Sequence, residues 1–438
     1  MTKEIINLQI GRCGIQFGHE FWKQICSEHG INPDGSTIQG KKNNFLEKNY
    51  TFFNQSLKDK YTPRAILFDL EPRIVSNLLN STFGNLYDKN NILAEKQGSG
   101  NNWANGYHRT LEYQSEIEEA LRKESEKCNK LGSFNLFHST MGGTGSGSGS
   151  LILEIIKEEF PGKFLNSFSV VPNQFEISDV VVQPYNSILS MRWLSLYCDC
   201  VTFFENDSLQ KIIDSKEKKS KISLLQINTL IAKILSAITL PVRVFDCLNI
   251  EFEGLFAPLI PIPNLHFLFA GISDYCFPGK KKVPSSLPLI AAKQTLVNKT
   301  VNSTFRKGKL LSALKCFDGK NNRENVSTRF KSILLESGIQ CIEWAPVSLH
   351  FSFINQIKTN EPNSREDVSL FNHTCVKNLF KKTLIHYDML RKRNAFLNGY
   401  LREFPPGEGL ELFDDARETV GNLLKEYDNA ESKDYPWK

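Results

Sequence analysis

The stretch Met-Gly-Gly-Thr-Gly-Ser-Gly-Ser-Gly at residues 141–149 places five glycines within eight residues. It follows the apolar run 134–137 and leads into Leu151, Ile152 and Ile155, whose spacing predicts a helix. Inside a helix each glycine costs about 1 kcal/mol relative to alanine, so the run needs a physical reason. Glycines let several backbone N–H groups approach one anion, and the positive end of the helix adds attraction. The stretch therefore predicts an anion cradle at a strand-to-helix junction.

Other glycine-rich patterns fit this loop less well. It lacks the Gly-Lys-Ser/Thr ending of the Walker loop, and its glycine spacing fits the dinucleotide fingerprint poorly. Glycine and serine are also typical of flexible linkers, but the position between a strand and a helix argues against a linker.

The first two hundred residues alternate short apolar runs with segments of helical spacing. Runs that are apolar on both faces are typical of parallel strands covered by helices on both sides. We therefore predict a doubly wound parallel-sheet α/β nucleotide-binding domain over residues 1–222, whose ligand lies outside the carboxyl ends of the strands. The predicted strands are 5–10, 65–70, 134–137, 164–171 and 201–204.

The remaining residues change pattern at a long apolar segment. Residues 223–243 are predicted to form one central helix, after which prolines at 258, 261 and 263 break the pattern. Strands at 265–270 and around 347–351 predict a second α+β domain with a mixed sheet over 244–371. Helical spacing returns from Asn372, so 372–438 is predicted to be a C-terminal helical region.

Three further loops are predicted at the same edge of the sheet as the glycine loop. They are 11–16 and 69–72, which follow strands, and 98–103, which precedes a helix. Asp69 and Glu71 are two residues apart, so both carboxylates can face a hydrated magnesium ion, although a solvated strand end has the same appearance. Convergence of four such loops predicts a nucleoside triphosphate site.

Composition argues against several classes of partner. The 53 basic and 48 acidic residues give a formal charge of +5, too small for this length to indicate nucleic-acid binding. The ten cysteines have no zinc spacing and are expected to be free thiols in a reducing, cytoplasmic compartment. The first residues are not a signal peptide, and we expect no apolar stretch long enough to span a membrane.

The loop Gly-Gly-Thr-Gly-Ser-Gly at 142–147 resembles the tubulin signature, apart from Met141, where a small residue is usual. The resemblance covers the entire chain, since the strings at 69–72, 100–104 and 178–186 fall in the family's order. Within the family the chain is most similar to gamma-tubulin. That similarity rests on the strings at 20–24, 28–31, 372–374 and 387–397, and on an end at 435–438 without the acidic tail of the alpha and beta proteins.

The resemblance implies that the ligand is GTP or GDP with Mg²⁺. By matching position, the residues that would contact phosphates, magnesium or ribose are Gly11, Arg12, Cys13, Gln16, Asn101, Gly142, Gly143, Thr144, Gly145, Ser146, Gly147, Ser148 and Asp179, together with Asp69 and Glu71 as metal ligands through water. Asn206 and Asn228 would bind the guanine edge, and Leu224 would lie beside the base.

Three positions depart from the family pattern. Arg12 stands where tubulins usually carry glutamine, so it either contributes about 1.5–3 kcal/mol as a charged phosphate contact or swings into solvent. Leu224 replaces the aromatic ring that stacks on the base. Gly254 stands where alpha-tubulin carries a carboxylate that completes hydrolysis on the next subunit, although Glu251 and Glu253 are nearby. We therefore assign no catalytic residue and expect hydrolysis, if any, to be slow or dependent on a partner.

Gamma-tubulin similarity implies a scaffold that nucleates microtubules at an organising centre, such as a centrosome or spindle pole body. The implied partners are alpha-beta tubulin dimers, gamma-tubulin complex proteins and lateral copies within a ring, with neither nucleic acid nor membrane. Two alternatives remain open. One is another divergent tubulin, of delta or epsilon type or a filament subunit. The other is a dinucleotide-dependent oxidoreductase. That function requires a glycine-rich turn after the first strand and an acidic residue about 20 positions later, and Gly11, Gly14 and Glu28 match this pattern only loosely.

Overall fold

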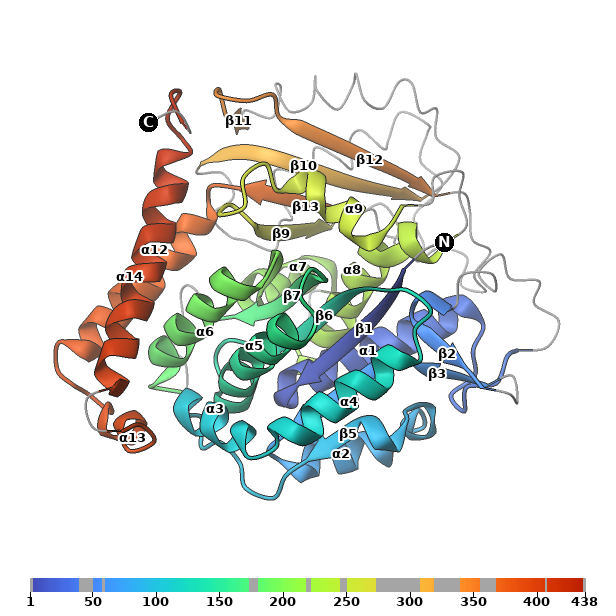
Figure 1. Ribbon diagram of the computed structural model, residues 1–438. Coiled ribbons are helices and arrows are strands. Elements are labelled where there is room, and N and C mark those ends of the chain that lie inside the picture. Colours follow the sequence, from blue (N-terminus) through green and yellow to red (C-terminus); the bar gives the residue numbers. More distant parts are fainter. Residues whose placement is uncertain are drawn as a thin grey trace.

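The computed structural model describes residues 3–38, 50–56, 60–172, 180–217, 222–244, 250–272, 308–318, 339–354, 368–405 and 408–435. Helices cover both faces of one extended sheet (Figure 1). The strands are β1 Glu4–Ile10, β2 Phe53–Gln55, β3 Tyr61–Pro63, β4 Ala65–Asp69, β5 Ile92–Ala94, β6 Leu131–Ser139, β7 Phe164–Val171, β8 Cys200–Glu205, β9 Phe267–Ile272, β10 Lys309–Asp318, β11 Gln340–Cys341, β12 Ser348–Ile354 and β13 Val368–His373. The helices are α1 Gly11–His29, α2 Pro72–Leu79, α3 Trp103–Leu111, α4 Gln114–Glu126, α5 Gly149–Glu159, α6 Gln183–Tyr197, α7 Asn206–Glu217, α8 Leu224–Arg243, α9 Phe252–Phe256, α12 Val376–Arg391, α13 Asn398–Leu401 and α14 Glu408–Asn429.

The sheet is parallel over its first part and mixed beyond it. Within the described residues the strand order is β11-β10-β13-β9-β8-β7-β6-β1-β4-β5, with β12 also paired to β10, while β2 and β3 form a separate hairpin. Neighbouring strands from β5 to β9 are parallel, and β13 runs antiparallel to both β9 and β10. The chain adds β4 and β5 on one side of β1, then β6 to β9 on the other. This reversal places a topological switch point between β1 and β6, where ligands of such sheets bind.

The predicted α/β fold class is confirmed, and the element boundaries show where the sequence pattern was incomplete. The strand 164–171 is β7, and all eight of its residues are buried because helices cover both faces. The central helix begins after Ser223, whose hydroxyl accepts the Gln226 N–H in a capping box. The mixed sheet of the second region is continuous with the first, because β9 pairs in parallel with β8. Asn372 lies in β13, so the last helical region starts four residues later, at Val376.

The two faces of the sheet have separate hydrophobic cores. One core joins the sheet to α3, α4, α5 and α6, and also to α12 and α14, which pack beside α6 (Figure 1). The other joins the opposite face to α1, α2, α7, α8 and α9. Since the parallel strands β1, β4, β6, β7 and β8 each contribute to both cores, their carboxyl ends are held firmly and form a rigid edge for a site.

Helix α8 corrects one prediction, because by length and composition it could cross a membrane. Most of its residues are buried, and it packs along α1. Near its end the fully buried Arg243 forms an ion pair of 2.8 Å with Glu28 and donates to the backbone oxygen of Ser236. A buried, paired charge of this kind and close helix packing are features of a core helix in a folded protein.

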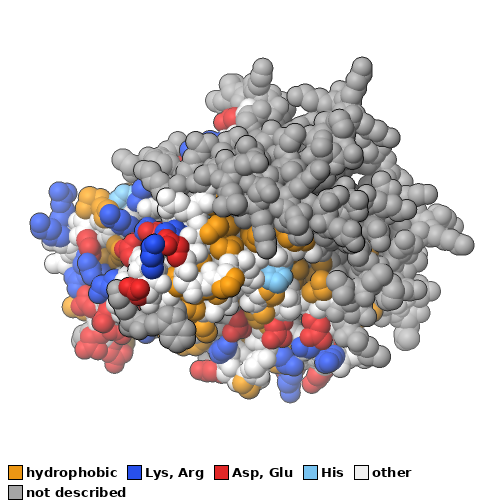
Figure 2. Space-filling model, turned by 90° about the horizontal axis from the view of Figure 1, so that it is seen from above, with side chains coloured by type: hydrophobic (Ala, Val, Ile, Leu, Met, Phe, Trp, Pro, Cys, Tyr) orange, Lys and Arg blue, Asp and Glu red, His pale blue; other side chains and the backbone are white. Residues whose placement is uncertain are grey.

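The C-terminal helices carry charges of both signs. Arg417 of α14 binds Asp388 of α12 at 2.8 Å, and Lys377 of α12 binds Glu431 at 2.7 Å. Figure 2 shows blue and red side chains mixed on the side where α12 and α14 lie in Figure 1.

The eight cysteines within the described residues are free, as predicted.

Candidate nucleotide-binding site

Loops from different strands meet at the switch point. Gly11 has φ 69°, and a Cβ built on it would lie 2.9 Å from the backbone nitrogen of Gly145. The hydroxyl oxygens of Ser99 and Thr144 are 3.1 Å apart. The carboxyl group of Glu71 lies beside Gly98, with Oε1 3.5 Å from the position of a Cβ on that glycine. All four predicted loops are therefore in contact at one edge.

The glycines of the loop allow close packing at one position and leave space for a ligand at another. Thr144–Ser148 forms a short π-helical segment that continues into α5, and such segments are often found at functional sites. A Cβ on Gly143 would lie 2.5 Å from Ser99 Oγ and 2.6 Å from the nitrogen of Asn102, so this glycine is required by packing against the neighbouring loop. A Cβ on Gly142 would meet no atom within 4 Å. Of these two glycines, only Gly142 borders open space that a ligand could use.

Helix N-termini provide the positive potential of the site. α1 begins at Gly11, α3 begins directly after Asn102, and α5 continues from the glycine loop. The first turns of these helices contain no acidic residue, so protein carboxylates do not neutralise their positive ends there. Burial raises the pKa of the Cys13 thiol to about 12, so this side chain is neutral at pH 7. The arrangement favours an anion such as a phosphate group.

The buried His138 forms a hydrogen bond with the backbone of the glycine loop. Nδ1 of His138 lies 2.8 Å from the carbonyl oxygen of Gly145. Since a carbonyl only accepts, Nδ1 carries the proton, and Nε2 accepts from the hydroxyl of Ser169 at 2.8 Å. Burial lowers the pKa of His138 to about 4, so the ring is neutral at pH 7. The neutral ring holds the Gly145 carbonyl toward the protein interior.

Asp69 is the best candidate for binding a cation. Its side chain is buried, Oδ1 accepts the Glu71 N–H at 3.1 Å, and no described residue partners Oδ2. The pKa of Asp69 is raised to about 7, mainly by burial and also by the charge of Glu71, while the Glu71 N–H and the charge of Arg12 act to lower it. A buried carboxylate oxygen without a partner is costly unless a proton or a cation satisfies it. Asp69 therefore fits hydrated magnesium, with the exposed Glu71 beside it.

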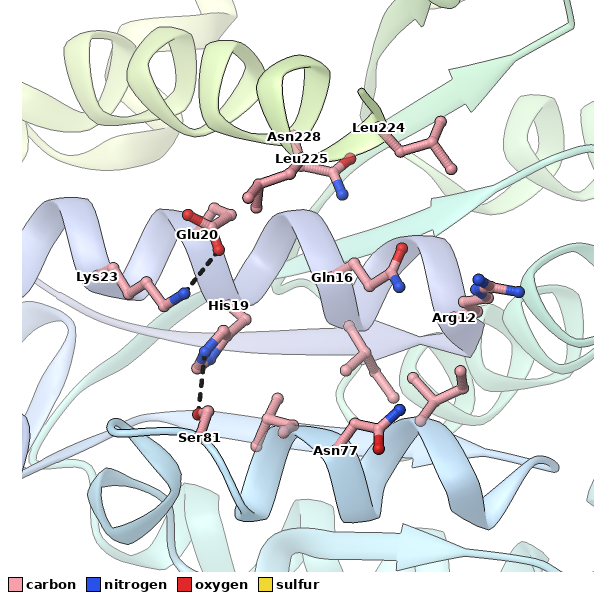
Figure 3. A pocket seen from close by; sticks show the side chains of 13 residues that line it. Arg12, Gln16, His19, Glu20, Lys23, Asn77, Ser81, Leu224, Leu225 and Asn228 are labelled. Carbon is pink, nitrogen blue, oxygen red and sulfur yellow. Dashed lines mark hydrogen bonds and ion pairs between the residues drawn. The ribbon is translucent and has the colours of Figure 1, made fainter. Parts of the chain in front are cut away.

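A groove of about 400 Å³ continues from the phosphate loops between α1, α2 and α8 (Figure 3). Arg12 and Gln16 line it from α1, and Leu224 and Asn228 line it from α8. The Leu224 side chain is 60% exposed, so it can contact a base but has no aromatic face to stack on one. The structure thus brings the predicted base-contacting residues of α8 to the predicted phosphate-contacting residues of α1.

The other predicted residues lie as follows. Asn206 begins α7 directly after β8, at the same edge, but is not among the residues that line the groove. Asn101 has φ 56° and precedes α3. Asp179 lies outside the described residues. Sequence reasoning missed Ser99, His138 and Asn186, although Ser99 lies within a predicted loop and Asn186 ends a string shared with the family.

Comparison with protein families matches residues 4–214 to the GTPase domain of the Tubulin/FtsZ family and residues 263–385 to the tubulin C-terminal domain. Together the two matches cover more than half of the chain. The match to a GTPase domain implies that the chain binds GTP or GDP. The two matches occur in the same order as the parallel and the mixed parts of the sheet. The chain belongs to the tubulin family.

Proposed function

We propose that the chain is a gamma-tubulin-like protein that binds GTP, nucleates microtubules and caps their minus ends. The observation that carries this proposal is the set of gamma-like strings at 20–24, 28–31, 372–374 and 387–397. They support the gamma type over other divergent tubulins because they lie in separate parts of the fold: two in α1 and the turn after it, and two in β13 and α12.

Several residues of these strings make buried or paired contacts. Asn372 Nδ2 donates to the carbonyl oxygen of Leu259 at 2.9 Å, which ties β13 to the segment before β9. The Tyr387 hydroxyl donates to the carbonyl oxygen of Phe413 and so joins α12 to α14. Lys392 and Arg393 are exposed at the end of α12. The exposed cations are available to a partner of acidic character, in keeping with assembly as the function.

We assign the nucleotide contacts by position within this proposal. The glycine loop, Gly11 and Arg12 would bind the phosphates, Asp69 and Glu71 would hold Mg²⁺ through water, and the groove would receive the base. Bound Mg²⁺ would neutralise charge between the phosphates and these carboxylates.

Hydrolysis is proposed to be slow or dependent on a neighbouring subunit. Gly254 lies in α9, and a Cβ there would meet no atom within 4 Å. The adjacent carboxylates are engaged elsewhere, since Lys3 binds Glu251 at 2.8 Å and Glu253 at 3.6 Å. A general base must reach the attacking water, and neither carboxylate is free to do so without breaking its pair with Lys3.

The proposed partners are alpha-beta tubulin dimers, gamma-tubulin complex proteins and lateral copies of the chain in a ring. The proposed location is the cytoskeleton at a microtubule-organising centre, a centrosome or spindle pole body.

A nucleation assay tests this function. The purified protein is titrated into alpha-beta tubulin below its spontaneous nucleation threshold, and new filaments are counted with GTP and without it. We expect the filament number to rise with the protein concentration in GTP. Filament ends that are bound without any increase in number would reduce the role to capping. Incorporation along the filament wall would instead identify a filament subunit.

A further inference from the structure

Asn186 connects two of the loops at the nucleotide site. It lies in α6 and is fully buried. Its Nδ2 donates to the carbonyl oxygen of Asn101 at 2.8 Å and to the carbonyl oxygen of Met141 at 2.8 Å. One carboxamide therefore joins the loop before α3 to the entrance of the glycine loop.

The oxygen of the same carboxamide is also fully used. Oδ1 accepts the Trp103 N–H, at the start of α3, at 2.9 Å. It also accepts the hydroxyl of Tyr400, in α13, at 2.6 Å. An amide side chain offers two donors and an oxygen with two lone pairs, and all of them are engaged here. The orientation of the Asn186 side chain is consequently fixed by three separate parts of the chain.

These hydrogen bonds also orient the peptide groups of the site. The Met141 carbonyl points to Asn186, so the N–H of Gly142, in the same trans peptide unit, points away from it. A Cβ on Gly142 would meet no atom within 4 Å, so a ligand can approach the backbone here. Turning the Met141 carbonyl inward therefore leaves the next N–H directed away from α6 and available to an anion.

We infer that Asn186 is a positioning residue for the phosphates of the nucleotide and that Tyr400 fixes its carboxamide. This inference rests on the nucleotide binding proposed above. Asn186 touches no part of the ligand in this account. It sets the relative position of two loops that do, so its loss should weaken the binding of a triphosphate far more than that of a monophosphate.

Three variants separate positioning from general stability. Asn186→Asp keeps an oxygen for Trp103 and Tyr400 but loses both donors to Asn101 and Met141. Tyr400→Phe removes one hydrogen bond to the carboxamide and is the milder second variant if Asn186→Asp does not fold. Tyr185→Phe is the matched control. It is in the same helix and the same aromatic cluster, but its hydroxyl donates to the carbonyl oxygen of Ala395.

Two measurements on the full chain test the inference: affinities for GTP and GMP with Mg²⁺, and amide hydrogen exchange of residues 98–103 and 141–147. We expect Asn186→Asp to weaken GTP binding at least about tenfold and GMP binding less than about twofold. Tyr400→Phe should weaken GTP binding about threefold to fivefold, and Tyr185→Phe should change neither affinity. Exchange should rise in both loops of Asn186→Asp and in neither loop of the control.

The outcomes distinguish this inference from the proposed function. Equal losses for GTP and GMP in Asn186→Asp, or unchanged GTP binding, would overturn the positioning role. A wild-type protein that binds no guanine nucleotide would instead contradict the proposed function, and the exchange data would still decide whether Asn186 holds the two loops.

Discussion

Gly11 and Gly145 approach each other so closely that a Cβ on Gly11 would lie 2.9 Å from the nitrogen of Gly145 and 3.3 Å from its Cα. Gly11 is the first residue of α1 and directly follows β1, and Gly145 belongs to the loop that follows β6. This contact joins the two strands that flank the switch point. It makes the phosphate end of the site a single packed unit.

Replacing Gly11 should damage both stability and binding. Gly11→Ala would have to keep φ near 69° and displace the glycine loop, which we expect to cost about 1–3 kcal/mol of unfolding free energy and most of the bound nucleotide. Gly421→Ala in α14 is the control. Its Cβ would meet no atom within 4 Å, and alanine favours a helix by about 1 kcal/mol. Denaturant titration and nucleotide content of both variants provide the test, and an unaltered Gly11→Ala protein would refute the packing argument.

Gly142 and Gly143 should respond differently to the same substitution. Gly143→Ala places a methyl group against Ser99 and Asn102, so it should lower both the melting temperature and the nucleotide affinity. The Cβ of Gly142→Ala would meet no protein atom within 4 Å. We therefore expect it to melt normally but to bind GTP more weakly because the methyl group occupies the approach of the phosphate. Normal GTP affinity in Gly142→Ala would show that the phosphates lie elsewhere.

Arg12 should strengthen GTP binding but slightly lower the stability of the protein without nucleotide. It lies in the first turn of α1, where a cation opposes the helix dipole by about 0.3–1 kcal/mol. Arg12→Gln should therefore leave the nucleotide-free protein equally or slightly more stable, but should weaken GTP binding about tenfold or more. Binding of guanosine, which has no phosphate, serves as the internal control. Equal GTP affinity in both proteins would mean that the guanidinium points into solvent.

Stability should fall in acid as His138 is protonated. Its pKa is lowered to about 4, below the ordinary value of 6.5, so the unfolded chain binds the proton more readily between these values. The contribution of the neutral ring is fully present above about pH 6.5 and is lost as the pH falls toward 4, by up to about 3 kcal/mol. His138→Gln should therefore show a shallower decline in the denaturation midpoint from pH 6.5 to 4. A slope equal to that of the wild type would assign the acid sensitivity to other groups.

Much of the fold could be predicted from the sequence because the pattern of apolar residues reports burial directly. The run 164–171 is apolar at five of its eight positions and is observed as the fully buried strand β7. Boundaries were less predictable where neighbouring residues fit two structures. The stretch 110–128 has continuous helical spacing, yet α3 ends at Leu111 and α4 begins at Gln114. Asn372 fits a helical pattern, but in β13 its side chain is held by the carbonyls of Leu259 and Leu265, which are more than a hundred residues away.

The parts of the site that lie next to a predicted strand or helix could be predicted from the sequence. The roles that depend on contacts between residues far apart in the sequence could not. The four loops follow strands or precede helices, so their convergence follows from the parallel sheet. The roles of His138 and Asn186 depend on contacts with Gly145, Asn101 and Tyr400, and no spacing in the chain indicates that these atoms meet. The structure also separates two reasons for the glycines of the loop. Gly143 is required by packing against Asn102, whereas Gly142 faces open space.

The nucleotide content of the purified protein tests the central claim most directly. The protein is isolated in Mg²⁺ without added nucleotide, denatured in acid, and the released compounds are separated by chromatography. We predict close to one GTP or GDP per chain in the wild type and much less in Gly11→Ala. A folded wild-type protein that releases no guanine nucleotide and does not take up GTP would contradict the account, and release of a nicotinamide or flavin would replace it with the dinucleotide alternative.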